Sequence, residues 1–448
     1  MKNILIAICF LISLPSCKKY LEKKPNQQWV IPATLQDAQA LMDNYFSFNT
    51  NFSMRGLQAD GDFYALDNYY NTLSTNSQDN YRWEKELYND NEWTYMYRLA
   101  LNSNIAMETV QKIIPAQSEV NMYREVLGAA HFHRANAFYH LLQYYAEPYE
   151  KSTAMQKPGI PLRLSSDINI PSTRATLENS WQQVIADLKQ SAAMLPLTVS
   201  SLARPSRKAA YAVLARTFLA MEDYPQAGLY ADSCLQFQNT LINYNTLNDA
   251  AANPFTQFSA EVIFSSVTIG LGLLTVTNGR CDSLLYGSYH ANDLRRTCFF
   301  KSNGTNTWGF RGNYDGGTGS SFFCGPAVDE MYLVRAECFA RAGNTTAAMN
   351  DLNALLLTRW KAGTFIPFTA ATAEEALTKI LIERRKELVA RTTRWFDLRR
   401  LNKDPRYAST LVRKINGETY TLPPGDPRYT HYIPLDVIAL TGMQQNSR

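Results

Sequence analysis

A short motif recurs three times along the chain, each time inside an apolar stretch with helical spacing. In the segments 134–138, 214–218 and 335–339, a small alanine is followed three residues later by phenylalanine. Alanine lets one helix approach its neighbour closely, and phenylalanine fills the gap beyond it, as in tetratricopeptide helix pairs. A further alanine follows the second and third copies at the same offset, Ala227 and Ala348. Coincidence explains one copy more easily than three, so the motif predicts a mostly α fold whose stacked helix pairs share a core.

Four segments carry the apolar spacing of such helix pairs. They span about 91–145, 176–237, 328–358 and 374–401. Between the second and third, residues from about 240 to 327 are predicted to form a loop-rich insertion, because 278–325 are rich in Gly, Asn, Tyr and Ser and have little periodicity. Within it, 261–266 and 273–277 have the composition of short β-strands. Near the end, Asn416-Gly417 predicts a short β-hairpin.

The densest charge pattern lies in residues 383–401, ERRKELVARTTRWFDLRRL. Large apolar residues interrupt the charges, so part of this stretch must be buried. Opposite charges lie three or four residues apart, which would pair Glu387 with Arg391 and Asp397 with Arg400 on one helical face. We therefore expect a partly buried, ion-paired helical element that locks the scaffold.

The same stretch allows a catalytic interpretation. Glu383 and Glu387 lie four residues apart, and two carboxylates at this spacing could serve as an acid–base pair. The surrounding arginines should keep both of them ionised. Structural ion pairs often imitate active sites in this way, so we expect no catalysis here.

The first residues have the pattern of an exported lipoprotein. A positive start is followed by an apolar run from Ile4 to Leu14, which is too short to span a bilayer. The run ends at Leu-Pro-Ser-Cys, which looks like a lipobox that makes Cys17 the lipidated first residue of the mature protein. The alternative is an ordinary secretory signal with an unrelated cysteine. We expect residues 1–16 to be a signal peptide and 17–448 to form a single domain.

Five cysteines remain after the leader and Cys17: Cys234, Cys281, Cys298, Cys324 and Cys338. The first and last lie on helical apolar faces and are expected to be buried thiols. The other three lie in the insertion of an exported protein, where we expect at most one disulfide among them. No cysteine or histidine spacing matches a zinc site, and His131 and His133 point to different helical faces. We expect neither a metal nor a cofactor.

Tyrosine and tryptophan are more abundant than a helical core requires, at 26 Tyr and 7 Trp. Both suit amphipathic binding surfaces, and carbohydrate is one ligand class that uses them. The formal net charge of +4 is too small and too dispersed to indicate a nucleic-acid partner.

Two stretches without helical periodicity carry aromatic residues that have no helix seam to fill. We predict that a ligand lies against Asp62, Tyr64, Tyr81 and Trp83 from the first stretch and Trp308 and Tyr314 from the second. Sugar rings stack on aromatic faces, while carboxylates and amides bond the hydroxyl groups. The alternative is that these rings only pack the loops onto the helical body.

The stretch 383–401 also resembles the C-terminal signature of the SusD/RagB family of outer-membrane nutrient-binding lipoproteins, E-R-R-x-E-L followed by R-W-F-D-L-x-R. The matching residues are Glu383, Arg384, Arg385, Glu387, Leu388, Arg394, Trp395, Phe396, Asp397, Leu398 and Arg400. Trp93, Tyr97 and Asn104 resemble another family landmark, and the likeness extends over nearly the whole chain. It departs at residues 436–440, where the family has a Pro-rich approach to a final Gln-Asn.

The resemblance implies a mostly helical, single-domain lipoprotein on the cell surface that captures glycan, or else peptide, fragments. It further implies that a SusC-like TonB-dependent transporter in the outer membrane receives them. Ligand sites in the family lie in the segments that vary most, so no site residue carries over.

Two other functions compete with a non-catalytic binding protein. One is a pure interaction scaffold of the outer membrane, whose helix pairs bind protein only. The other is a glycoside hydrolase, which needs two carboxylates flanking a cleft. Asp60 and Asp62 form the only loop pair near aromatic residues, and we expect no enzyme.

Overall fold

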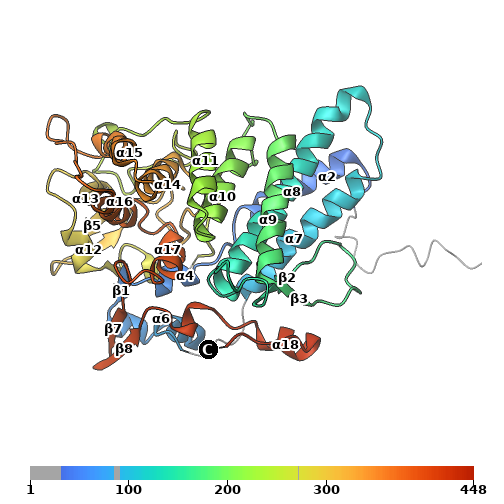
Figure 1. Cartoon of the computed structure of the whole chain (residues 1–448). Helices are drawn as coiled ribbons and strands as arrows, with labels where there is room; N and C mark the ends of the chain where they lie inside the picture. Colours follow the sequence, from blue (N-terminus) through green and yellow to red (C-terminus); the bar gives the residue numbers. More distant parts are fainter. Residues whose placement is uncertain (1–31, 85–90, 271, 448) are drawn as a thin grey trace, which may run out of the picture.

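The computed structural model describes residues 32–84, 91–270 and 272–447, and the helices of this part of the chain form an extended row (Figure 1). The long helices are α7 (Asn91–Val110), α8 (Val120–Tyr145), α9 (Leu177–Met194), α10 (Arg207–Ala220), α11 (Tyr224–Leu235), α14 (Val328–Arg341), α15 (Thr345–Leu357) and α16 (Ala373–Glu387). Each packs against the next from α7 to α11, α11 packs against α14, and α14 packs against both α15 and α16. The row is therefore continuous across the insertion between α11 and α14. Among the described residues, no helix has the length and apolar character needed to cross a membrane.

Polar side chains fix where these helices begin. Thr176, Ser206, Asp223 and Asn344 each precede a helix and accept a hydrogen bond from the backbone N–H three residues further on. Such caps satisfy one of the N–H groups that the first turn leaves without a partner. Asp223 and Asn344 stand in the two turns that separate paired helices, so local sequence sets the length of each helix.

The repeated motif lies in the seams between helices, as its composition predicts. Ala135, Ala215 and Ala336 are fully buried, which allows the close approach of neighbouring helices. Phe218 stacks on Tyr230 of the paired helix with ring centroids 5.5 Å apart. The mostly α, tetratricopeptide-like fold expected from the sequence is confirmed.

The strands form four separate antiparallel pairs, β1–β4, β2–β3, β5–β6 and β7–β8. Their bounds are β1 (Phe63–Ala65), β2 (Pro158–Pro161), β3 (Arg174–Thr176), β4 (Gly279–Cys281), β5 (Phe300–Ser302), β6 (Trp308–Phe310), β7 (Leu411–Ile415) and β8 (Glu418–Leu422). β7 and β8 form the predicted hairpin, in which Asn416 and Gly417 have φ angles of 51° and 84°. Both values suit a two-residue turn that matches the twist of the strands.

The two β-like segments of the insertion are not strands. Residues 261–266 make only an isolated bridge, between Val262 and Ala327. Residues 273 and 274 belong to a short 3-10 helix (Gly272–Leu274), and 275–277 form a turn. The backbone N–H groups of two successive residues both point to the carbonyl of Pro326. Proline has no N–H to return to the ladder, so pairing cannot extend there.

The remaining helices of the described residues are α2 (Leu35–Met42), α3 (Tyr45–Phe48), α4 (Arg55–Ala59), α5 (Asp67–Tyr70), α6 (Thr75–Tyr81), α12 (Ser283–Gly287), α13 (Arg295–Cys298), α17 (Thr393–Leu401) and α18 (Leu435–Thr441).

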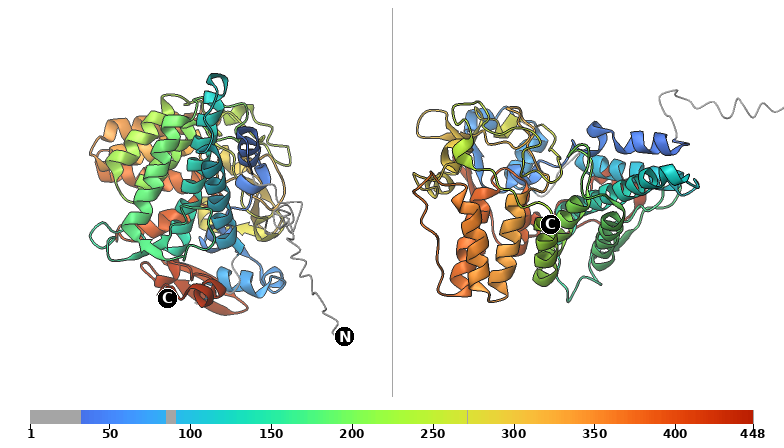
Figure 2. Two further views of the ribbon diagram at one scale, coloured as in Figure 1. Left: turned by 90° about the vertical axis from the view of Figure 1, so that its right-hand side faces the viewer. Right: turned by 90° about the horizontal axis from the view of Figure 1, so that it is seen from above.

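The first stretch predicted to be irregular instead contains short elements, namely α4, β1, α5 and α6. Phe63 and Tyr81 of this stretch pack with Phe299 and Phe310 of the insertion in a second hydrophobic core. The two stretches are thus parts of one loop-rich unit beside the helical row (Figure 2).

The cysteines of the described chain are all buried free thiols. Those of the insertion therefore form no disulfide with one another. Burial raises the pKa of the Cys298 thiol to about 11 and that of Cys324 to about 12, so both are protonated at neutral pH. The insertion is held together by packing and hydrogen bonds.

Candidate functional site

The charged stretch 383–401 does not present a single helical face. α16 (Ala373–Glu387) ends within it, and α17 (Thr393–Leu401) begins after a turn of five residues. In that turn Ala390 and Thr392 adopt positive φ angles of 60° and 65°. Residues with a Cβ seldom adopt this conformation, and it persists where the surrounding packing enforces it.

The turn changes the ion pairs that the sequence predicts. Arg391 lies beyond the end of α16 and donates to Asp329 at 2.9 Å. The predicted pair between Glu387 and Arg391 is therefore wrong. Asp397 does accept a hydrogen bond from Arg400, at 2.9 Å, because both lie on α17.

A buried charge network surrounds Glu387. Arg359 Nε donates to Glu387 Oε1 at 2.8 Å, and Arg295 Nη1 donates to Glu387 Oε2 at 3.0 Å. Arg359 also binds Glu261 at 2.8 Å, and Arg295 binds Glu383 at 2.5 Å. None of these five side chains is more than 5% exposed. The expected buried, ion-paired element is present, and it ties α16 to the insertion.

These carboxylates are structural. Glu383 and Glu387 have oxygens bound to arginine, so they do not form an acid–base pair. Burial raises the pKa of Glu261 to about 7, although the charge of Arg359 opposes this shift. Oxygens of Glu261, Asp329 and Glu387 lie within 4.8 Å of one another, a spacing that could suit a metal ion. The guanidinium groups already supply positive charge to this cluster, which therefore does not favour a cation.

Two of the predicted ligand aromatics are buried beside the C-terminal hairpin. The Tyr81 hydroxyl accepts a hydrogen bond from Ala65 N at 2.8 Å, and the Arg413 guanidinium lies 3.7 Å from the centre of its ring. Trp83 donates from Nε1 to the Ala59 carbonyl at 3.0 Å. The two side chains are only 2% and 3% exposed. Both rings therefore pack the loops onto the helical body, as the alternative interpretation states.

The same correction applies to two further predicted residues. Asp62 is fully buried and accepts from Arg385 Nε at 2.8 Å. Tyr314 donates to Glu261 at 2.9 Å, and its ring lies 3.6 Å from the Arg391 guanidinium carbon. Neither has surface left for a ligand. Sequence periodicity separates helices from loops, but it does not distinguish a buried loop from an exposed one.

Two predicted residues keep exposed surface. Trp308 is partly buried and stacks on Tyr286, with ring centroids 3.7 Å apart and planes 12° apart. The Arg296 guanidinium carbon lies 4.9 Å from the centre of the Tyr286 ring. Tyr64 pairs with Arg280 across β1 and β4. We name Trp308 and Tyr286 the Trp308 platform; the sequence analysis missed Tyr286, whose position opposite Trp308 depends on the fold of the insertion.

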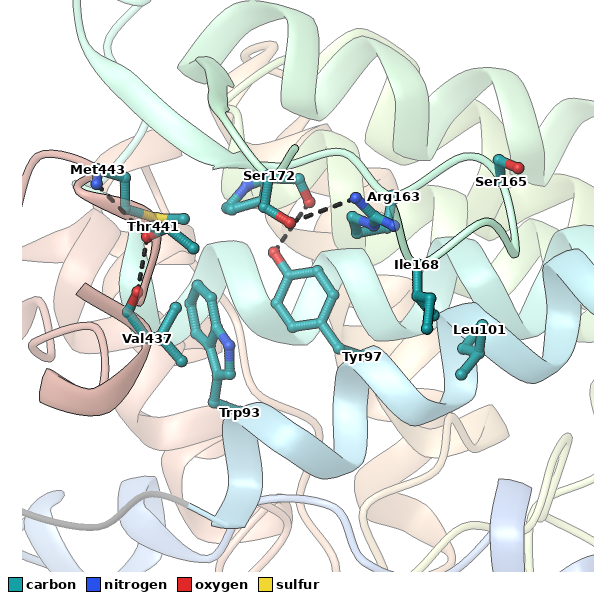
Figure 3. A pocket seen from close by; sticks show the side chains of 11 residues that line it. Trp93, Tyr97, Leu101, Arg163, Ser165, Ile168, Ser172, Val437, Thr441 and Met443 are labelled. Atoms are coloured by element: carbon teal, nitrogen blue, oxygen red, sulfur yellow. Dashed lines mark hydrogen bonds between the residues drawn. The ribbon is translucent and has the colours of Figure 1, made fainter. Parts of the chain in front are cut away.

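A cavity of about 290 Å³ lies away from the insertion, between α7, the loop that joins β2 to β3, and α18 (Figure 3). Its walls are formed by Trp93, Tyr97, Leu101, Pro161, Arg163, Ser165, Ile168, Ser172, Val437, Thr441 and Met443. Trp93 and Tyr97 pack with ring centroids 4.8 Å apart. The Tyr97 hydroxyl donates to the Pro161 carbonyl at 2.9 Å. We name this space the α18 cavity; the sequence showed the two aromatic residues, but not that three distant segments meet around them.

Two family models match the chain. One, described as "Starch-binding associating with outer membrane", matches residues 19–219, and the SusD family model matches residues 329–433. SusD-like protein P2 of Formosa agariphila is 24% identical over an alignment of 370 residues, and the match covers 69% of this chain and 71% of that protein.

Solved structures share the fold. A SusD superfamily protein from Bacteroides thetaiotaomicron superposes with a TM-score of 0.77 at 20% identity, covering 93% of this chain and 100% of that one. A putative sugar binding protein from Bacteroides vulgatus gives 0.73 at 20% identity, with 93% and 99% covered. A laminarin binding SusD-like protein gives 0.67 at 14% identity, with 91% and 97% covered. These structures show the shared fold, whereas the two family models, which together match more than half of the chain, and the signature on α16 and α17 show that the chain belongs to the SusD/RagB family.

Proposed function

We propose that the protein is a lipid-anchored, surface-exposed binding protein that captures oligosaccharides and delivers them to a SusC-like TonB-dependent transporter of the outer membrane. The Trp308 platform is the observation that carries this proposal. Tyr286, whose ring also carries the Arg296 guanidinium, stacks on the indole from one side, so the indole needs no reordering before a sugar stacks on it, and preorganisation favours binding. The laminarin-binding relative supports a glycan as the ligand.

The proposed role is binding without hydrolysis. A glycosidase needs two carboxylates on either side of a scissile bond in an open cleft. Asp60 and Asp62 are 1% and 0% exposed. Burial and the neighbouring Asp62 charge raise the pKa of Asp60 well above its usual range. This pair belongs to the interior of the loop-rich unit and does not face a cleft.

Removal of Trp308 should weaken glycan binding without affecting the fold. Stacking on one ring contributes about 0.5–1.5 kcal/mol beyond area burial, so Trp308→Ala should raise the Kd for a bound neutral oligosaccharide by up to about tenfold. Calorimetric titration with a panel that includes laminarin oligosaccharides measures this change. Trp308→Phe keeps a ring and should lose less. As a control, Phe46→Ala removes a ring that is 78% exposed and lies outside the Trp308 platform, and it should leave the Kd unchanged. Equal affinity of Trp308→Ala and the wild type would place the glycan elsewhere.

Anchoring depends on Cys17, which lies outside the described residues. Cys17→Ala should release the protein from the membrane fraction and abolish incorporation of labelled palmitate, because a multi-chain anchor is lost. Cys9→Ala, inside the leader, is the matched control and should leave the protein anchored. A Cys17→Ala protein that stays in the outer membrane and still takes up palmitate would refute the assignment.

A further inference from the structure

The α18 cavity contains one charged group, the guanidinium of Arg163. This group donates to the carbonyls of Ile170 and Asp167 and lies 3.3 Å from the Ser172 hydroxyl (Figure 3). Within the described chain, no carboxylate lies within 4.0 Å of it. The loop thus fixes the position of the guanidinium but does not neutralise its charge.

Nearby carboxylates are occupied by other groups. Glu108 accepts hydrogen bonds from Ser165 at 3.0 Å and from the backbone of Ser166 at 2.8 Å. The Asp167 carboxylate accepts from Asn169 at 2.9 Å. Both acids serve the loop that forms one wall of the cavity. The lining of the cavity itself contains no acidic residue.

A second guanidinium strengthens the positive field. Arg174 donates to the carbonyls of Gly159, Pro158 and Gln444 at 2.8, 3.2 and 3.0 Å. Burial lowers its pKa to about 10, so it remains charged at neutral pH. Its charge and that of Arg163 both favour the ionised form of the Tyr97 hydroxyl, while burial dominates and raises that pKa.

The arginines of the charge network around Glu387 have different partners from those at the α18 cavity. There Arg295 and Arg359 each bind two or more carboxylates, as buried charges require. Among the described residues, Arg163 in the cavity and Arg174 beside it donate hydrogen bonds only to neutral oxygens. Arg163 is also partly exposed, so an anionic ligand in the cavity can reach its guanidinium.

The other residues that line the cavity indicate the chemistry of the uncharged part of such a ligand. Tyr97, Leu101 and Met443 offer apolar surface, and Ser172 and Thr441 offer hydroxyl groups. Pockets that combine apolar walls with a few fixed polar groups suit small cyclic ligands. A sugar ring has apolar faces and a polar edge, and a guanidinium pairs with a carboxylate or an ester of sulfuric acid through two parallel hydrogen bonds.

We propose that the α18 cavity is a second binding site that takes an acidic sugar, with its ring between Tyr97 and Met443 and its anionic group at Arg163. The anionic group is the carboxylate of a uronic acid or a sulfate ester. The inference rests on the proposed function in taking the ligand to be a glycan, but it concerns a different place. α12 and β5 of the insertion lie at the left of Figure 1, whereas β2, β3 and α18 lie at the right.

Calorimetric titration with trigalacturonate and its methyl ester tests the charge directly, because the two ligands differ only in the masked carboxylates. The free acid should bind at least about tenfold more tightly, as expected for a charged hydrogen bond. Arg163→Gln should remove that advantage and leave the ester unaffected. Arg124 is an exposed arginine that also donates to a carbonyl, that of Ala193. Arg124→Gln removes an equal charge and should leave the affinity for both ligands unchanged. A sulfated trisaccharide and its neutral parent identify which anion is preferred.

A second pair of variants avoids any effect of Arg163 on the loop. Ile168 lines the cavity and is 81% exposed, so its replacement should not disturb the fold. Ile168→Glu should weaken the binding of the acidic sugar several-fold, whereas Ile168→Lys should preserve or strengthen it.

The inference is overturned if no acidic sugar binds, if acid and ester bind equally, or if Arg163→Gln and Ile168→Glu leave the acid affinity unchanged. Its failure is separable from that of the proposed function. Neutral glycan binding that is lost in Trp308→Ala would still support the Trp308 platform.

Discussion

Glu387→Ala is expected to lower the free energy of unfolding by about 3–5 kcal/mol, because it leaves two buried guanidinium groups short of a counter-charge. Glu387 is fully buried, and its two oxygens bind Arg359 and Arg295 separately. Removing the side chain therefore affects α16 and the insertion together. Urea unfolding followed by tryptophan fluorescence measures the change.

The matched control is on the same helix. Glu374 is exposed and pairs with Arg406 on the surface, where ion pairs contribute little. Glu374→Ala should leave the unfolding midpoint where it is. Equal midpoints for the Glu387→Ala and wild-type proteins would mean that the buried network adds nothing to stability.

Trp395→Ala should cost a similar amount, about 3–5 kcal/mol, through the cavity left in the core. Trp395 is 0% exposed, and its ring lies 4.8 Å from that of Tyr429 and 5.9 Å from that of His431. On its other side α4 approaches so closely that a Cβ on Gly56 would lie 3.1 Å from the Trp395 Cβ. The indole thus fills the junction of α17, α4 and the C-terminal segment.

Thermal unfolding of Trp395→Ala beside Trp308→Ala tests this prediction. Trp308 is partly exposed on the insertion, so its loss should lower the Tm far less. A Trp395→Ala protein with the wild-type Tm would show that the neighbouring elements hold together without the indole. The Tm of Trp395→Phe should lie between those of Trp395→Ala and the wild type, because phenylalanine leaves a smaller void than alanine does.

The helical row was predictable because its determinants are local. Ala135 and Phe138 lie one turn apart on one helix, and Asp223 caps the helix that follows it in sequence. Spacing along the chain therefore carries the information. The same holds for Asn416 and Gly417, whose positive φ angles specify the hairpin without help from the rest of the fold.

The ion partners and ligand residues depend on contacts between distant segments. Arg359 reaches Glu387 from just after α15, and Arg295 reaches it from the insertion. The spacing of residues near Glu387 therefore gave the wrong partner, Arg391. Tyr81 is covered by Arg413 of the C-terminal hairpin. An aromatic residue in an aperiodic stretch has the same sequence signature whether it is covered or open, and only the tertiary structure decides.

The pairing of β1 with β4 has a consequence for how the chain reaches its native state. Phe63 can pair with Cys281 only once more than half of the polypeptide is available, and Arg413, which covers Tyr81, comes later still. Contacts this distant in sequence form slowly, and strands and rings that lack their partners in the meantime favour aggregation. The segment that carries Tyr81 and Trp83 is therefore the part of the folding chain most exposed to aggregation, and a chain truncated before the β7–β8 hairpin would lack Arg413 and leave the Tyr81 ring uncovered.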